Sequence, residues 1–127
     1  MSEPQAQARP TILVADDNEA LRRMTREALE EFGYRVIEAS TGKQAGEQLR
    51  QEKIDLLMTD LIMPDSEGIE TIADAKQNFP SLRILAISGS SQDYLDGAAM
   101  LGADGTLRKP FKLEDLRSAV ARLLTAV

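Results

Sequence analysis

The chain has 127 residues, enough for one ordinary domain, and its 43% hydrophobic and 28% charged content is typical of a soluble globular protein. It contains no cysteine and no histidine, which excludes disulfides, thiolate or imidazole metal ligands and catalysis by either residue type. The net charge of −6 argues against direct nucleic-acid binding, and no signal peptide or membrane-spanning run is recognisable, so a cytoplasmic location is expected.

Along the chain, short apolar runs alternate with amphipathic segments. Residues 1–10 are polar and without periodicity, which predicts a flexible arm before a single domain at 11–127. Strands are predicted at 11–15, 34–39, 54–59, 82–88 and 104–108. Helices are predicted between and after them, at about 21–32, 42–51, 67–79, 91–101 and 113–124. Five strands alternating with five helices predict an α/β fold, a doubly wound parallel sheet with helices on both faces.

Details of three helices can also be predicted. In the first helix, Arg22 falls toward the polar face, opposite the apolar stripe. The second helix is weaker, and Gly46 is expected to interrupt it. The apolar stripe of the last helix is expected to include Leu113, Leu116, Val120 and Leu123.

Three aspartates stand where such a fold binds its ligands, at the carboxyl ends of the strands. Asp16 and Asp17 follow the first predicted strand, and Asp60 follows the third. Asp55 lies at the opposite end of the third strand, roughly 16 Å from Asp60, and Asp65 is a typical turn residue. If the first and third strands are neighbours, three carboxylates converge and require a cation. Mg²⁺ suits a site of oxygen ligands that retains water.

Helix capping is the ordinary explanation for the first pair of acids. Asp16 and Glu19 have capping-box spacing, and Asn18 is itself a good N-cap residue. Capping does not require two adjacent aspartates, and it leaves Asp60 unexplained.

Two more polar side chains fall at the same predicted edge. Ser88 ends the fourth strand, whereas Ser90 or Ser91 is sufficient to cap the helix that follows. A lysine beside a proline is usually a solvated surface residue. With the acids at the same edge, Lys109 is better explained as a cation directed into the site.

Together these pieces resemble one family, the receiver domains of two-component response regulators, from about residue 11 to 125. The matching pieces are Asp16-Asp17, "TDLIMPDSEG", "SGS" after the fourth strand and "KPF" at 109–111. The resemblance implies a flavodoxin-like fold with strand order 2-1-3-4-5, as in a chemotaxis regulator of the family.

The resemblance also implies a mechanism, in which Asp60 accepts a phosphoryl group as a carboxylate nucleophile. The implied Mg²⁺ ligands are Asp17, Asp60, the backbone carbonyl of Ile62, and Asp16 either directly or through water. Lys109 would pair with a phosphoryl oxygen, Ser88 would swing toward the phosphoryl group, and the Lys109-Pro110 bond is typically cis. The domain is thus expected to accept and lose its own phosphoryl group and not to be a turnover enzyme.

The partners implied are a phosphodonor and an output protein. The donor would be the phosphohistidine of a sensor histidine kinase or a histidine phosphotransfer protein. The output partner would bind the face formed by the fourth helix, fifth strand and fifth helix, as phosphorylation shifts its conformation. The family often has an aromatic residue where this sequence has Thr106, so the face is expected to change through Ser88 and the backbone. Ile62 and Ser90 stand where the family tunes phosphoryl lifetime.

Several alternatives remain. The chain could be the receiver part of a longer regulator or hybrid kinase, or a degenerate receiver used only as a binding scaffold. A flavodoxin would need an uncharged phosphate loop where this sequence has "ADDNE". A haloacid-dehalogenase-type phosphatase would need a second aspartate at the place of Ile62.

Overall fold

Five parallel strands form the central sheet of the computed structural model, which describes residues 9–63, 66–89, 96–99 and 101–125, with no side-chain description at 62–63 and 66–69. The strands are β1 (Thr11–Ala15), β2 (Arg35–Ala39), β3 (Leu56–Asp60), β6 (Arg83–Ser88) and β7 (Gly105–Arg108). Their order is β2-β1-β3-β6-β7, which is the predicted 2-1-3-4-5 order counted along the chain. The flavodoxin-like α/β prediction is confirmed. Most of the predicted arm at 1–10, together with Asp65 and Ser90, lies outside the described residues.

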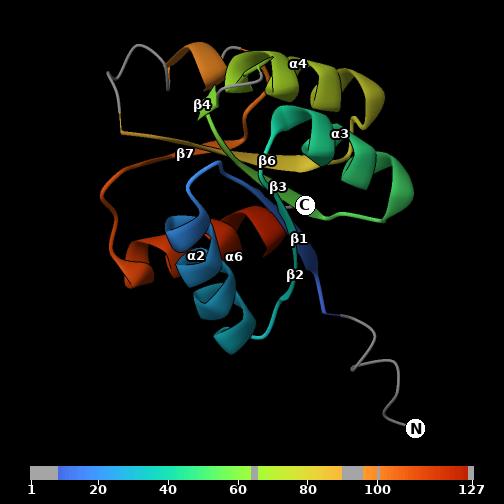
Figure 1. Ribbon diagram of the computed structural model, residues 1–127. Helices are drawn as coiled ribbons and strands as arrows, with labels where there is room; N and C mark the ends of the chain where they lie inside the picture. The colour runs from blue at the N-terminus through green and yellow to red at the C-terminus, as the bar shows by residue number, and fades with distance from the viewer. Residues whose placement is uncertain (1–8, 64–65, 90–95, 100, 126–127) are drawn as a thin grey trace, which may run out of the picture.

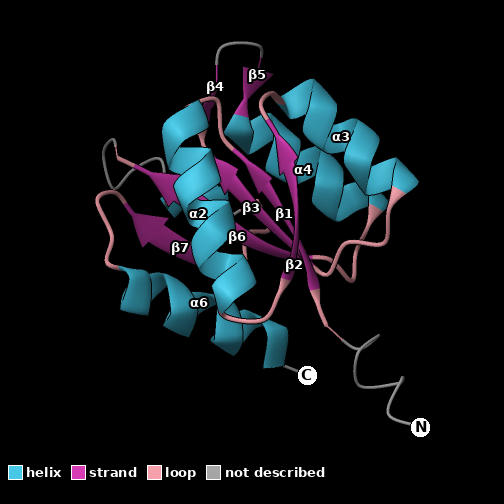
Figure 2. Cartoon of the chain, turned by 60° about the horizontal axis from the view of Figure 1, so that its bottom comes forward, coloured by secondary structure: helices cyan, strands magenta, loops and turns pink. Residues whose placement is uncertain are grey.

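Helices cover both faces of this sheet. They are α2 (Glu19–Glu31), α3 (Gly42–Gln51), α4 (Gly68–Asn78) and α6 (Leu113–Thr125), with a further helical segment at 96–99. The helices α2 and α6 lie on one face, and α3 and α4 lie on the other (Figures 1 and 2). None of the helices in the described part of the chain combines the length and the apolar character needed to cross a membrane.

The two faces of each central strand feed two separate cores. Ile12 and Val14 of β1 pack with α2 and α6, whereas Leu13 and Ala15 pack with α3 and α4. Every residue of β1 and β3 is buried, because a parallel sheet with helices on both sides exposes neither face. The central strands therefore form a rigid support, and their carboxyl ends are fixed in space.

Apart from shifts of one or two residues at the ends of several strands and helices, four details differ from the sequence predictions. A short antiparallel hairpin, β4 (Ile62–Met63) with β5 (Ser66–Glu67), follows β3, and two-residue strands are too short to give a periodic signal. The helix α3 continues through Gly46, at the modest cost of one helical glycine. Leu113, which was predicted to belong to the apolar stripe of α6, is 51% exposed. Ala119, which was not predicted there, is buried on that helix. The Arg22 side chain is only 14% exposed, because it folds back toward the sheet.

Candidate functional site

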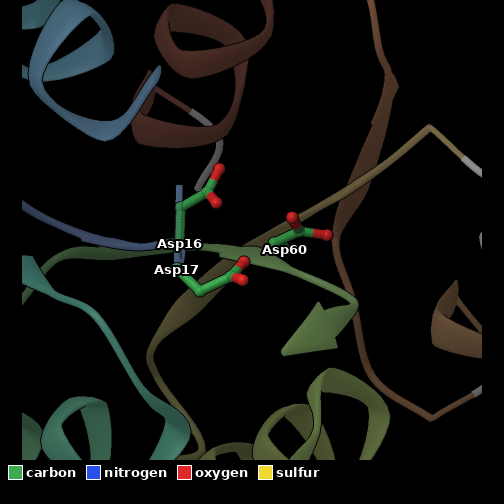
Figure 3. Close-up of side chains that lie close together, drawn as sticks. All are labelled: Asp16, Asp17 and Asp60. Atoms are coloured by element: carbon green, nitrogen blue, oxygen red, sulfur yellow. The ribbon is translucent and has the colours of Figure 1, made fainter. Parts of the chain in front are cut away.

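The predicted site residues meet at the carboxyl edge of the sheet. Asp16 directly follows β1, Asp60 ends the neighbouring strand β3, and β1 and β3 pair in parallel. Carboxylate oxygens of Asp16, Asp17 and Asp60 all lie within 4.8 Å of one another. In Figure 3 the Asp17 carboxylate points toward Asp60, while Asp16 leaves the backbone on another side. The predicted convergence of three acids is therefore present in the fold.

Helix capping does not account for the acidic pair. Asn18 is the N-cap of α2, and its side chain accepts a hydrogen bond from the Leu21 backbone N–H. The Oδ1 atom of Asp16 instead accepts the backbone N–H of Asn18 at 2.9 Å. Burial raises the pKa of Asp16 above its usual value, although this hydrogen bond and the charge of Lys109 oppose the rise. Asp16 is thus directed into the site and not used as a cap.

Lys109 enters the site from the end of β7. Its Nζ donates to Oδ2 of Asp60 at 2.8 Å and to Oδ2 of Asp16 at 3.3 Å. The Lys109-Pro110 peptide bond is cis, and the backbone N–H of Lys109 donates to the Ser88 carbonyl. Burial by itself would lower the pKa of Lys109, but the hydrogen bond to Asp60 and the charge of Asp16 outweigh burial, so the pKa is raised. Lys109 remains a cation, as expected from the sequence.

The donor set fits a hard divalent cation. The acids offer only oxygen atoms, Asp16 and Asp60 are largely buried, and Asp17 is exposed to solvent that can supply water ligands. A cation there would offset three clustered negative charges, which Lys109 only partly compensates. Ile62 lies two residues beyond Asp60, in β4, so its backbone belongs to the same edge.

Ser88 and Thr106 lie on the neighbouring strands β6 and β7. Ser88 is fully buried at the end of β6, the strand next to β3. Thr106 lies in β7, in register with Ala86 of β6. Side-chain alternation places Thr106 on the sheet face away from α6, because Leu107 packs with the α2 and α6 core.

The remaining aspartate of the third strand has a structural role. Asp55 lies before the amino end of β3, and its Oδ2 accepts the backbone N–H of Thr11 at 2.8 Å. This hydrogen bond ties the start of β1 to the start of β3. Position along the strand, as predicted, separates Asp55 from Asp60.

The sequence matches the model of the response regulator receiver domain over residues 12–121. The chain belongs to this family. Receiver domains are signalling phosphoacceptors, not turnover enzymes, and the acidic cluster of Asp16, Asp17 and Asp60 is consistent with their metal site.

Individual relatives show the same likeness. The receiver domain is 37% identical to the response regulator receiver protein CpdR of Brucella abortus, covering 91% of this chain and 97% of CpdR. It is 34% identical to the chemotaxis protein CheY of Halobacterium salinarum, with the same two coverages. The structure of TrrA from Thermotoga maritima in complex with Mg²⁺-BeF superimposes with a TM-score of 0.84, at 28% identity, over 91% of this chain and 99% of TrrA. Other relatives are longer, since the chain covers 50% of one transcriptional regulator and 12% of one sensor kinase.

One residue beside the site was missed by the sequence analysis. The NH1 group of Arg22 donates to the backbone carbonyl of Asp16 at 2.7 Å. The sequence gives no signal for such a contact. Every residue has a backbone carbonyl, so no residue type marks one of them as the partner of a basic side chain on the polar side of a helix.

Proposed function

We propose that this receiver domain takes a phosphoryl group from a partner phosphohistidine onto Asp60, in a Mg²⁺-dependent reaction. The observation that carries the proposal is the position of Asp60. Its carboxylate ends a fully buried strand, lies within 4.8 Å of Asp16 and Asp17, and accepts the Lys109 ammonium at 2.8 Å. A carboxylate held in this way has a fixed direction of attack.

The transfer is a substitution at phosphorus. An Asp60 carboxylate oxygen forms the new O–P bond, the P–N bond of the phosphohistidine breaks, and its electron pair leaves with the donor imidazole, which takes up a proton. Lys109 pairs with a phosphoryl oxygen, and the buried Ser88 hydroxyl donates to another. Mg²⁺, when bound, offsets the charge that builds up on the phosphoryl oxygens.

The proposed Mg²⁺ ligands are Asp16, Asp17, Asp60 and the Ile62 carbonyl. Support comes from the oxygen-only cluster and from TrrA, which binds Mg²⁺ with a beryllium fluoride group. Before Mg²⁺ binds, Lys109 donates to both Asp60 and Asp16 and so holds these two carboxylates together.

A protein donor is supported by an apolar groove next to Lys109. The groove has a volume of about 440 Å³ and is lined by Leu21, Met24, Thr25, Lys109, Pro110, Phe111 and Leu113. Met24 and Leu113 are 54% and 51% exposed, although both are large hydrophobic residues. We assign this groove to the helix of a sensor histidine kinase or a histidine phosphotransfer protein that carries the phosphohistidine.

A charge placed in the groove tests this assignment. Met24→Glu should slow transfer from the protein donor about tenfold while leaving phosphorylation by a small phosphodonor unchanged. Leu101→Glu is the matched control, since Leu101 is 46% exposed elsewhere on the molecule. Equal effects of the two variants on transfer would contradict the assignment.

Output is proposed to pass through the face made by the 96–99 segment, β7 and α6. Ser88 and the backbone carry the change, and Thr106 takes no part as a switch. Thr106→Ala should therefore leave phosphorylation-dependent partner binding intact. Loss of that binding with phosphorylation retained would make Thr106 the switch residue. We place the reaction in the cytoplasm, whether the domain stands alone or belongs to a longer regulator.

The central test is chemical. The protein is incubated with Mg²⁺ and a small phosphodonor such as acetyl phosphate, and a base-labile phosphoryl adduct is measured by intact mass. Wild type and Asp55→Asn should form the adduct, whereas Asp60→Asn should not, because Asp55 belongs to the same segment but lies at the opposite edge. Absence of an adduct in wild type would favour the binding-scaffold alternative, and its persistence in Asp60→Asn would refute Asp60 as the acceptor.

A further inference from the structure

The Arg22 guanidinium connects a second strand to the acidic pair. Its Nε pairs with Oε1 of Glu38 on β2 at 2.8 Å, and its NH1 donates to the Asp16 carbonyl at 2.7 Å. The other carboxylate oxygen of Glu38 is held by NH1 of Arg26 at 2.7 Å. Arg22 and Glu38 are only 14% and 23% exposed, so this arrangement is more than a surface ion pair.

The carbonyl that Arg22 binds belongs to the peptide group joining Asp16 to Asp17. The backbone N–H of Asp16 is already fixed by the Ala39 carbonyl of β2, at 3.1 Å. Fixing the carbonyl as well sets the plane of the next peptide, and hence the direction in which Asp17 leaves the strand. Asp17 is exposed. The hydrogen bonds that Asn18 and Lys109 donate here go to the Asp16 carboxylate and not to the Asp17 side chain.

We infer that Arg22 is a positioning residue for the metal site, held by Glu38 so that its guanidinium fixes the Asp16–Asp17 peptide. The inference rests on the proposed Mg²⁺ site, to which it adds a supporting contact. Partners that orient metal ligands typically change metal affinity by about 10–100-fold when removed. A guanidinium is suited to this task, because its planar fork reaches a carboxylate and a carbonyl at once.

Two simpler roles predict different results. If Arg22 only clamps α2 to β2, its loss lowers stability and leaves Mg²⁺ affinity unchanged. If only its charge matters, its loss tightens Mg²⁺ binding, since a positive charge near the site repels the cation. The positioning role predicts the opposite sign, a weaker affinity.

Arg26 provides the matched control. It is also an arginine of α2 paired with Glu38, but its guanidinium donates to Glu30 and Glu38, whereas the Asp16 carbonyl accepts from Arg22. Arg22→Gln and Arg26→Gln should both lower the free energy of unfolding in EDTA. Only Arg22→Gln should raise the dissociation constant for Mg²⁺, by about tenfold, measured by isothermal titration calorimetry. The chain has no tryptophan, so calorimetry replaces intrinsic fluorescence.

Arg22→Lys keeps the measurement informative if Arg22→Gln does not fold. Lysine retains the charge and can pair with Glu38, but one ammonium does not bridge Glu38 and the Asp16 carbonyl in the same geometry. Weaker Mg²⁺ binding in this variant, with a shifted Asp17 amide resonance, would support the inference. Unchanged or tighter binding in Arg22→Gln or Arg22→Lys would overturn it. Failure of wild type itself to bind Mg²⁺ would instead overturn the proposed metal site, which keeps the two outcomes distinct.

Discussion

Replacing Lys109 by methionine should destabilise the metal-free protein and make its stability more dependent on Mg²⁺. Methionine keeps an unbranched stem and removes the charge. The Lys109 Nζ donates to Asp60 at 2.8 Å and to Asp16 at 3.3 Å, and all of these side chains are mostly buried. Without the ammonium, the three carboxylates within 4.8 Å lose the cation that pairs with two of them.

The size of the effect follows from the shorter contact. A hydrogen bond between charged groups contributes roughly 1.5–3 kcal/mol, and the longer contact to Asp16 contributes less, so a loss of about 2–3 kcal/mol is expected. For a domain of 127 residues, unfolding entropy of about 2.1 cal/mol/K per residue makes 1 kcal/mol correspond to about 4 °C. The expected fall in melting temperature in EDTA is therefore about 10 °C.

Thermal unfolding followed by circular dichroism, in EDTA and in saturating Mg²⁺, checks this expectation. Mg²⁺ should recover at least half of the loss, because the cation replaces the missing charge and no longer competes with Lys109 for the carboxylates. Lys112→Met, at an exposed lysine nearby, controls for the loss of one positive charge. The reasoning is refuted if Lys109→Met melts within about 2 °C of wild type in EDTA. It is equally refuted if the loss is the same with and without Mg²⁺, since that would indicate lost packing and not lost charge.

Three further changes have defined outcomes. The pKa of Glu38 is lowered from its ordinary value of 4.5, chiefly by the hydrogen bond from Arg26. The ionised Glu38 therefore stabilises the fold above pH 4.5, and this stabilisation is lost as the pH falls through the lowered pKa of the folded state. The stability difference between wild type and Glu38→Gln, measured by urea unfolding, should thus shrink from pH 7 to pH 3, and a constant difference would contradict it. Gly102→Ala should cost about 2–3 kcal/mol in chemical denaturation without affecting phosphorylation, because φ is +123° and the new Cβ would lie 2.8 Å from Cγ of Lys76. Ile62→Asn should lose its phosphoryl group faster than wild type in a decay assay, since asparagine can orient an attacking water, and equal decay rates would rule this out.

Most of the fold could be predicted because the hydrophobic pattern of each segment matches the burial of the strand or helix that the segment forms. The run "TILVA" coincides with β1, and "LRILAIS" coincides with β6 except for its first residue, since strands buried on both faces are largely apolar. Gly33 ends the first helical pattern and has a φ of +104°, which favours glycine. The strand order itself came from the family resemblance, since local patterns do not determine which strands are neighbours.

The acidic site could be predicted for a related reason. The carboxyl ends of parallel strands share one edge, so Asp16, Asp17 and Asp60 come together once the first and third strands are neighbours, which the family resemblance implied. Lys109 was predicted to point inward, and its contacts with two of the acids agree. Contacts to backbone atoms were not predictable, and Arg22 is the clearest case.

The position of Asp16 is fixed by contacts with several elements and not only by β1, which it follows. Its N–H binds β2, its carbonyl binds α2 through Arg22, and its carboxylate binds both Asn18 and Lys109. Three of these four contacts do not involve Lys109, and they would hold the acidic pair in place for the Mg²⁺ that we propose to bind there. The fourth, to Lys109, is the one that a cation or a phosphoryl group can take over. Under the proposed Mg²⁺ site the acidic pair needs little reorganisation, since among the contacts of Asp16 only the one with Lys109 has to change partner.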